Sequence, residues 1–302
     1  MKCLVTGGAG FIGSNLVDKL ISNKHKVLAF DNQATNPSYW NLKAENFNEE
    51  LIATEPWEDQ IFKEFKPDWV FHLAAQPSIP FCIEHPYESM EENLNFTIKM
   101  LELSRQHKVK KFIFSSTSAI YGLKNKPPLK ESMNADCLNP YSAAKLSAEI
   151  LCKMYYTLYG LKTVSLRYFN VYGKRQRDVG QYAPVIGTFL NQHYNKQDLT
   201  VVGNGKQIRD YIHVNDVVSA NISAAKSKDE RTYGEIFNIG TGKGYNVLDV
   251  ANMIGGNIRH IPERAGEAKV SLSDNSKAKK LLKWKPNYKL EDYIEGELKY
   301  YV

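Results

Sequence analysis

A glycine-rich turn near the start of the chain constrains its fold more than any other feature. Residues 6–13 read TGGAGFIG, directly after the apolar run 3–5 and at the start of a segment with apolar residues at helical spacing. Glycines at 7, 10 and 13 permit a tight strand-to-helix turn and let the backbone approach a pyrophosphate. The helix would then offer free N–H groups and a positive dipole end to those phosphates. This order predicts the phosphate loop of a dinucleotide-binding unit.

An acidic residue lies where such a unit binds the adenosine ribose. Asp31 ends the second apolar run, 18 residues after Gly13, close to the spacing expected for a ribose-binding acid. A carboxylate there would repel a 2′-phosphate, and Asn32 follows it rather than an arginine. The sequence therefore favours NAD over NADP.

Short apolar runs recur along the chain and are separated by segments of helical pattern. They are nearly continuous rather than alternating, as in strands buried on both faces of a parallel sheet. Their alternation with helices predicts an α/β fold built on a doubly wound parallel Rossmann sheet. The runs are residues 3–5, 27–30, 69–71, 112–114 and 163–166.

The pattern loosens in the second half, where glycine-containing loops such as residues 203–205 interrupt shorter elements. We therefore expect residues 1–173 to form the dinucleotide-binding Rossmann domain. Residues 174–302 are expected to form a smaller C-terminal substrate-binding domain. Segments around 210–240 are expected to return to the main sheet.

Tyr141 and Lys145 form a candidate acid/base pair. They stand four residues apart after Pro140, which suits the first turn of a helix, and this spacing places both on one helical face. A phenol with its ordinary pKa of about 10 is a poor base near neutrality, and a nearby ammonium is expected to lower that pKa. The pair could then move a proton to or from an alcohol during hydride transfer.

Together with these motifs, further segments make the sequence similar to the extended short-chain dehydrogenase/reductase family. Within that family it most resembles nucleotide-sugar 4-epimerases of the UDP-glucose and UDP-N-acetylglucosamine type. The resemblance covers nearly the whole chain and implies NAD as cofactor, a UDP-sugar as substrate, and residues 174–302 as the nucleotide-sugar-binding domain. The segments are TGGAGFIGSNL at 6–16, HLAAQ at 72–76, SSTSAIYG at 115–122, NPYSAAK at 139–145, RYFNVYG at 167–173, GNGKQIRDYIHVNDV at 203–217 and RAGEAKVSLSD at 264–274.

The resemblance assigns roles to the matching positions. Thr117 would hydrogen-bond the reacting hydroxyl, Tyr141 would be the acid/base, and Lys145 would hold the nicotinamide ribose and tune Tyr141. The expected cofactor contacts are Gly7, Gly10, Phe11, Ile12, Gly13, Asp31, Asn32, Ala74, Ala75, Gln76, Asn93, Ser115, Tyr141 and Lys145. The expected substrate contacts are Thr117, Ser118, Ser271, the diphosphate ligands Asn170, Arg209 and Arg264, and Glu267 on the nucleotide ribose.

The absence of certain residues narrows the choice of reaction. Related dehydratases and decarboxylases carry an acid just before the Tyr-Gly of the 115–122 segment, where this chain has Ser118 and Ala119. That segment also has no cysteine for the Cys/Lys route of some relatives. The expected reaction is therefore C4 epimerisation through a transient 4-keto sugar. The alternatives are a nucleotide-sugar reductase or dehydrogenase, and a non-catalytic NAD-binding regulator, which would have no need of an acid/base.

Ser271 bears on the choice of sugar. It lies seven positions after Arg264, where relatives restricted to glucose tend to carry tyrosine, so the resemblance implies room beside C2 for an N-acetyl group. This favours UDP-GlcNAc and UDP-GalNAc, with UDP-Glc and UDP-Gal as further substrates. UDP-glucuronate is an alternative because its epimerases also carry small residues there.

One departure from the family concerns adenine. The usual Gly-Asp, whose acid reads adenine, appears here as Ala53-Thr54. We expect adenine recognition to be weaker or to come from another residue.

Composition bears on partners and location. The net charge of +6 comes from scattered lysines, so no nucleic-acid partner is expected. The four cysteines have neither CxxC nor metal-ligand spacing, which predicts a reducing, cytoplasmic location and no metal site. No secretory or membrane-spanning segment is evident. The resemblance implies a homodimer formed through helices near 91–107 and 142–158.

Overall fold

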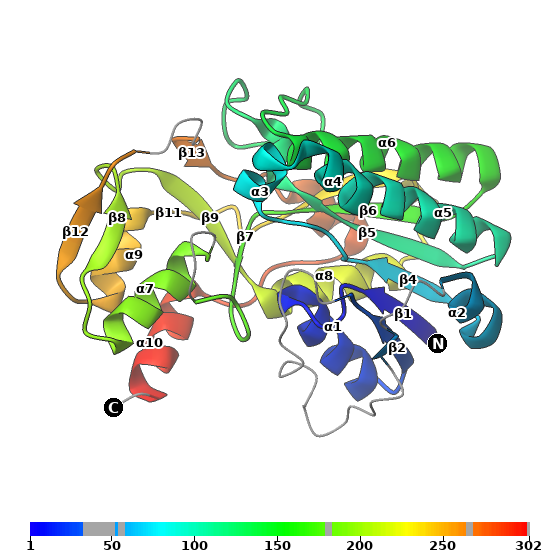
Figure 1. Ribbon diagram of the computed structural model, residues 1–302, viewed down its shortest axis with the longest axis horizontal. Helices are drawn as coiled ribbons and strands as arrows, with labels where there is room; N and C mark the ends of the chain where they lie inside the picture. The colour runs from blue at the N-terminus through cyan, green and yellow to red at the C-terminus, as the bar shows by residue number, and fades with distance from the viewer. Residues whose placement is uncertain (33–51, 54–57, 179–182, 264–267, 301–302) are drawn as a thin grey trace.

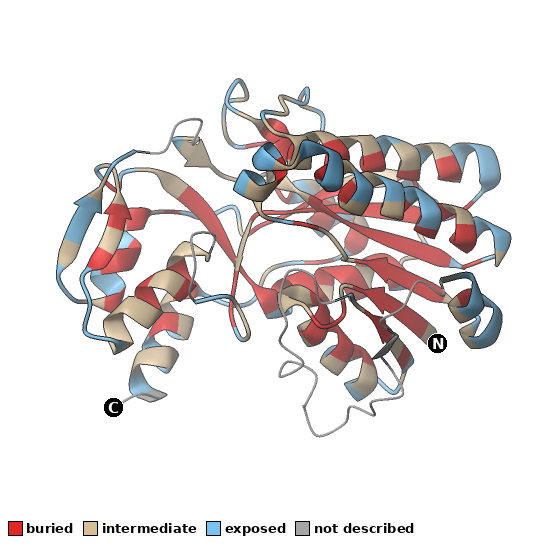
Figure 2. Cartoon of the chain, viewed as in Figure 1, coloured by how far each residue is buried: buried red, intermediate tan, exposed pale blue. Residues whose placement is uncertain are grey.

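The computed structural model describes residues 1–32, 52–53, 58–178, 183–263 and 268–300 of the chain. In Figure 1 a large α/β part containing the N-terminus lies beside a smaller part containing the C-terminus. Both parts have their own buried core. The strands of the large sheet are mostly buried, whereas the smaller part also has intermediate and exposed strand residues, as Figure 2 shows.

A seven-stranded sheet forms the centre of the large part, and all its neighbouring strands are parallel. The five apolar runs expected to be strands all lie in it. In spatial order the strands are β10 (Glu235–Ile239), β6 (Thr163–Tyr168), β5 (Lys111–Thr117), β4 (Trp69–His72), β1 (Lys2–Thr6), β2 (Lys26–Phe30) and β3 (Ile52–Ala53).

Helices cover both faces of this sheet, so the expected doubly wound α/β fold is confirmed. One face carries α1 (Phe11–Ser22) and α8 (Val214–Lys226), which pack in one apolar cluster with strands β1, β2, β4, β5, β6 and β10. The opposite face carries α2 (Glu58–Phe65), α5 (Phe96–Gln106) and α6 (Pro140–Tyr159). In the part of the chain that the structure describes, no helix is both long and apolar enough to cross a membrane.

The strand order creates a crevice at one edge of the sheet. From β1 the chain moves outward to β2 and β3, then returns to place β4 on the other side of β1. Helices that follow β1 and β4 therefore lie on opposite faces, and the loops after these strands diverge. In open α/β sheets, ligands bind at this reversal point, beyond the carboxyl ends of the strands.

The smaller part is built around β9 (Ile208–His213). This strand pairs with β7 (Asn170–Tyr172), β11 (Gly244–Asn246) and β13 (Val270–Ser271), while β8 (Leu199–Val202) pairs with β12 (Ile258–Ile261). Three helices pack against these strands in one apolar core: α7 (Val185–Tyr194), α9 (Val247–Ile254) and α10 (Leu290–Tyr300).

The segments expected to return to the main sheet do so only in part. Strand β10 joins the large sheet beside β6, and α8 packs on that sheet. Strand β9 instead belongs to the smaller sheet, because its partners β7, β11 and β13 lie there. We propose residue 173 as the domain boundary, with α8 and β10 assigned to the larger part.

Candidate active site

The glycine turn between β1 and α1 forms a cradle without side chains. Gly7 has a φ of +69°, and a Cβ placed on it would lie 2.7 Å from the backbone nitrogen of Ala74. A Cβ on Gly13 would collide with the carbonyl oxygen of Gly7. Helix α1 begins after Gly10 without a side-chain cap, so its first N–H groups remain available to an anion. The cradle fits a pyrophosphate.

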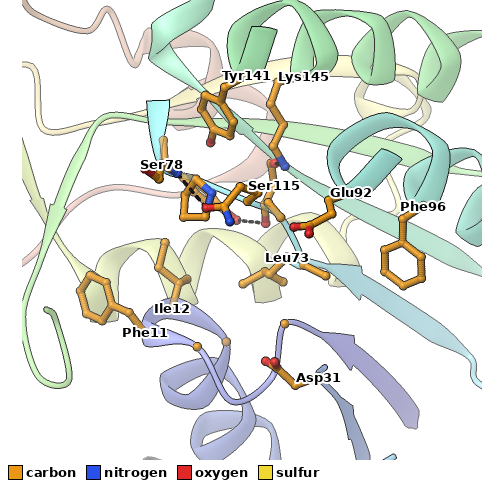
Figure 3. A pocket seen from close by; sticks show the side chains of 18 of the residues that line it. Phe11, Ile12, Asp31, Leu73, Ser78, Glu92, Phe96, Ser115, Tyr141 and Lys145 are labelled. Atoms are coloured by element: carbon orange, nitrogen blue, oxygen red, sulfur yellow. Dashed lines mark hydrogen bonds between the residues drawn. The ribbon is translucent and has the colours of Figure 1, made fainter. Parts of the chain in front are cut away.

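A cavity of about 650 Å³ opens above this cradle, at the carboxyl ends of β1, β2, β4 and β5. Figure 3 shows its walls, with Phe11 and Ile12 on one side and Tyr141 and Lys145 on the other. Every residue expected to contact the cofactor lines it except Asn93. These residues are Gly7, Gly10, Phe11, Ile12, Gly13, Asp31, Asn32, Ala74, Ala75, Gln76, Ser115, Tyr141 and Lys145.

Asn93 is fully buried behind the cavity wall. Its side-chain oxygen accepts a hydrogen bond from the Gln76 backbone nitrogen at 3.0 Å, and its amide donates to the Gln76 carbonyl at 3.2 Å. Asn93 therefore fixes the loop after β4 instead of lining the cavity.

Further residues, none of them predicted from the sequence as cofactor contacts, complete the wall. The additional lining residues are Phe30, Leu73, Pro77, Ser78, Glu91, Glu92, Phe96, Ser116, Tyr168, Arg177 and Pro184. Tyr168 could have been found from its place in the RYFNVYG segment, and its hydroxyl is 2.9 Å from the Ser115 hydroxyl. The contribution of residues such as Phe96 depends on packing between distant elements, which local spacing does not reveal.

Helix α6 presents Tyr141 and Lys145 to the cavity. Asn139 caps the helix by accepting a hydrogen bond from Ser142 N at 2.9 Å, and Pro140 occupies its first position. These residues form a helix start because proline lacks an N–H and the asparagine oxygen satisfies a free one. Lys145 is 2% exposed and donates to the Ser115 carbonyl at 3.0 Å, so its ammonium is held at the end of β5.

Burial dominates the electrostatics of this pair. It raises the pKa of Tyr141 to about 12, against the opposing effect of a hydrogen bond with Thr117. It also lowers the pKa of Lys145 to about 8. The expectation that Lys145 lowers the pKa of Tyr141 is therefore wrong for this arrangement. The Lys145 Nζ lies 5.9 Å from the phenol ring centre and is engaged with Ser115, so desolvation of the phenolate prevails.

A buried ion pair holds α6 against the sheet. Glu149, one turn beyond Lys145, accepts hydrogen bonds from Arg167 Nε at 2.9 Å and Nη2 at 2.7 Å. The two side chains are 1% and 4% exposed, respectively. The Ser116 hydroxyl also donates to Glu149, at 2.5 Å. Helix α6 and strands β5 and β6 are thus tied together directly behind the acid/base pair.

The residues expected to bind the nucleotide sugar gather on the smaller sheet. Ser271 pairs with Arg209 across β13 and β9. Asn170, on the neighbouring β7, donates to the Asp210 carbonyl at 3.1 Å. Thr117 and Ser118 lie separately, at the end of β5. The two other expected ligands, Arg264 and Glu267, lie outside the described residues.

Asp210 connects three segments of this region. It is fully buried beside Arg209 in β9. One carboxylate oxygen accepts hydrogen bonds from Thr241 N at 2.8 Å and from Thr241 Oγ1 at 2.6 Å. The other accepts from Gly242 N, Ser273 N and Ser273 Oγ at 3.0, 3.0 and 2.5 Å. Asp210 therefore fixes β9 and the segment after β13 relative to the loop after β10.

We expect Asp210→Asn to weaken nucleotide-sugar binding more than NAD binding. The amide nitrogen of asparagine would face N–H and O–H groups that now donate to the carboxylate. Each buried group left unpaired in this way costs about 1–3 kcal/mol. Steady-state kinetics should show a raised KM for the sugar, and titration should show an unchanged Kd for NAD. The exposed Asp178→Asn is the control. Equal losses for both ligands would contradict a local effect.

Comparison with known proteins agrees with this geometry. Residues 3–240 match the NAD dependent epimerase/dehydratase family. The crystal structure of UDP-glucose 4-epimerase from Thermotoga maritima, with UDP-glucose, is 37% identical, with a TM-score of 0.92 over 100% of this chain and 98% of that chain. The UDP-N-acetylglucosamine 4-epimerase of Methanobrevibacter ruminantium, in complex with UDP-N-acetylmuramic acid, is 35% identical, with a TM-score of 0.91 over 99% and 97%. The UDP-glucuronic acid 4-epimerase of Bacillus cereus, in complex with UDP-glucuronic acid and NAD, is 31% identical, with a TM-score of 0.90 over 100% and 99%.

The chain therefore belongs to the NAD-dependent epimerase/dehydratase family, as its resemblance implied. Within that family it is an NAD-dependent nucleotide-sugar 4-epimerase. NAD is its cofactor, and the glycine cradle and the cavity above it fit this dinucleotide.

Proposed function

We propose that this enzyme interconverts the C4 epimers UDP-GlcNAc and UDP-GalNAc, and that it also accepts UDP-Glc and UDP-Gal. The proposal rests on Ser271, which neighbours Arg209 across β13 and β9. A hydroxymethyl group beside an expected diphosphate ligand leaves more room than a phenol ring. That room suits an N-acetyl group on C2 of the sugar.

The acid/base residues divide the chemistry between them. Tyr141 takes the proton from the C4 hydroxyl and returns it to the 4-keto oxygen after the sugar has turned over. Thr117, hydrogen-bonded to Tyr141, orients the reacting oxygen. Lys145 holds the nicotinamide ribose and, because it is cationic, favours the phenolate form of Tyr141, the form that can accept this proton, when the two are brought together. NAD, when bound, supplies reversible hydride transfer at C4.

A single incubation separates the proposed reaction from its alternatives. With UDP-GlcNAc and no added reductant, NMR should show conversion to UDP-GalNAc without net formation of NADH. Stoichiometric NADH would indicate a dehydrogenase, and no turnover of any UDP-sugar would indicate an NAD-binding regulator. Conversion of UDP-glucuronate in preference to UDP-GlcNAc would favour the alternative substrate, against which Ser271 alone does not discriminate.

Ser271→Tyr should remove activity on N-acetylated sugars selectively. The added ring would fill the space proposed for the acetamide, whereas the glucose hydroxyl at C2 needs less room. We expect kcat/KM for UDP-GlcNAc to fall about tenfold or more, with UDP-glucose affected much less. Ser271→Ala is the control, because it changes polarity but not space. Equal loss on both sugars would argue against a size filter.

We also propose a homodimer formed by two neighbouring helical segments. The segments η3 (Glu91–Asn95) with α5, and α6, lie side by side on one face of the large part (Figure 1). They expose the apolar side chains Ile98, Ile150 and Leu158, which a second copy would cover. Light scattering should give twice the chain mass, and Ile150→Glu should yield monomers. A monomeric wild-type protein would contradict this.

A cytoplasmic location remains a prediction from the cysteines. All four are described in the structure, and all are free thiols, as expected in a reducing compartment. Fractionation of cells that express the protein would test it.

A further inference from the structure

The wall of the cofactor cavity near Asp31 carries two side chains from one helical turn. Phe96 begins α5 and stacks on Phe30, with ring centres 6.0 Å apart. Phe30 directly precedes Asp31, the acid expected on the adenosine ribose. Glu92 lies four residues before Phe96 in η3 and lines the same cavity. Figure 3 shows both side chains on one wall, with the Glu92 carboxyl toward the cavity.

The Glu92 carboxyl has no partner within the part of the chain that the structure describes. Burial alone accounts for the raised pKa of this group. Its neighbour Glu91 differs, because it is exposed and accepts a hydrogen bond from Asn95 Nδ2 at 2.5 Å. A partly buried carboxylate without a partner is costly, and a donor on a bound ligand would remove that cost.

Adenine offers a donor that fits this position. Its exocyclic amino group donates hydrogen bonds, and its flat ring packs against apolar side chains such as Leu73 and Phe96, which line this end of the cavity. The position at which related enzymes read adenine with an acid holds Thr54 in this chain. We propose that Glu92 accepts a hydrogen bond from the amino group of the NAD adenine, with Leu73 and Phe96 packing against the ring. The proposal depends on NAD binding and not on the identity of the sugar.

Nicotinamide hypoxanthine dinucleotide provides a direct test. It replaces the amino group of adenine with a carbonyl oxygen, which a carboxylate repels. Calorimetric titration of the wild-type protein, freed of endogenous cofactor, should show binding about tenfold or more tighter for NAD than for this analogue. Glu92→Leu should weaken NAD binding and bring the two Kd values close together.

A second variant keeps the test independent of any loss of folding. In Glu92→Gln the amide can turn either its oxygen or its nitrogen toward the base. This variant should therefore bind both cofactors, and it should bind the analogue more tightly than the wild type does. Glu88→Gln is the control, because Glu88 is exposed and does not line the cavity, and it should keep the wild-type ratio. Equal affinities in the wild type, an unchanged ratio in Glu92→Leu, or equal weakening of both cofactors would overturn the proposal.

Discussion

Tyr141→Phe is expected to lower kcat by about 10²- to 10⁴-fold, the contribution usual for a positioned proton-transfer group. Phenylalanine keeps the ring but has no hydroxyl to accept the C4 proton. Turnover of UDP-GlcNAc followed by NMR, with NAD content read from absorbance, is the measurement.

A phenol elsewhere on the same helix provides the control for this experiment. The Tyr155 hydroxyl donates to Glu102 of α5 at 3.2 Å, and Tyr155 packs in the apolar cluster with α5 rather than lining the cavity. Tyr155→Phe should therefore leave kcat close to the wild-type value. Near-normal turnover in Tyr141→Phe, with the fold intact by circular dichroism, would exclude Tyr141 as the acid/base.

Arg167→Leu is expected to lower the free energy of unfolding by about 3–5 kcal/mol. The substitution would leave Glu149, 1% exposed, without the guanidinium that neutralises it. Urea unfolding measures the effect. The double substitution Glu149→Leu with Arg167→Leu should regain part of the lost stability, because it removes the stranded charge.

A surface pair on a neighbouring helix is the control for Arg167. Arg105 and Glu102 form an ion pair in α5, with side chains 38% and 34% exposed. Arg105→Leu should cost less than about 1 kcal/mol, since water screens the remaining charge. If Arg167→Leu costs no more than Arg105→Leu, the buried pair does not stabilise the fold as argued.

Continuous apolar runs predicted five of the seven strands of the large sheet, because a strand buried on both faces leaves a local signature. Strand β3 has only two residues and β10 follows a long excursion through the smaller part, so neither has such a signature. For a similar reason, no local pattern distinguishes β9, which pairs in the smaller sheet, from β10, which joins the large one. Strand pairing depends on contacts between residues far apart in sequence.

The candidate site likewise combines residues that local sequence patterns predict with residues that only distant contacts bring into place. Glycines and the Tyr141–Lys145 spacing are local patterns, and the residues expected from them line one cavity. The direction of the Tyr141 pKa shift was wrong because desolvation depends on all the surrounding atoms. Glu92 and Phe96 were missed, since they reach the cavity only once separate helices and strands have packed. Tyr168 was also missed, although it lies in the RYFNVYG segment.

The path of the chain between the two parts has a practical consequence. After β7 the backbone enters the smaller part, returns as α8 and β10, and leaves again at β11. A fragment ending at residue 173 would therefore lack the edge strand β10 and the helix α8. It would expose apolar sheet side chains such as Leu166, which those elements cover in the intact protein. Such a fragment should be prone to aggregation, so neither half is a sound module for expression, fusion or domain exchange.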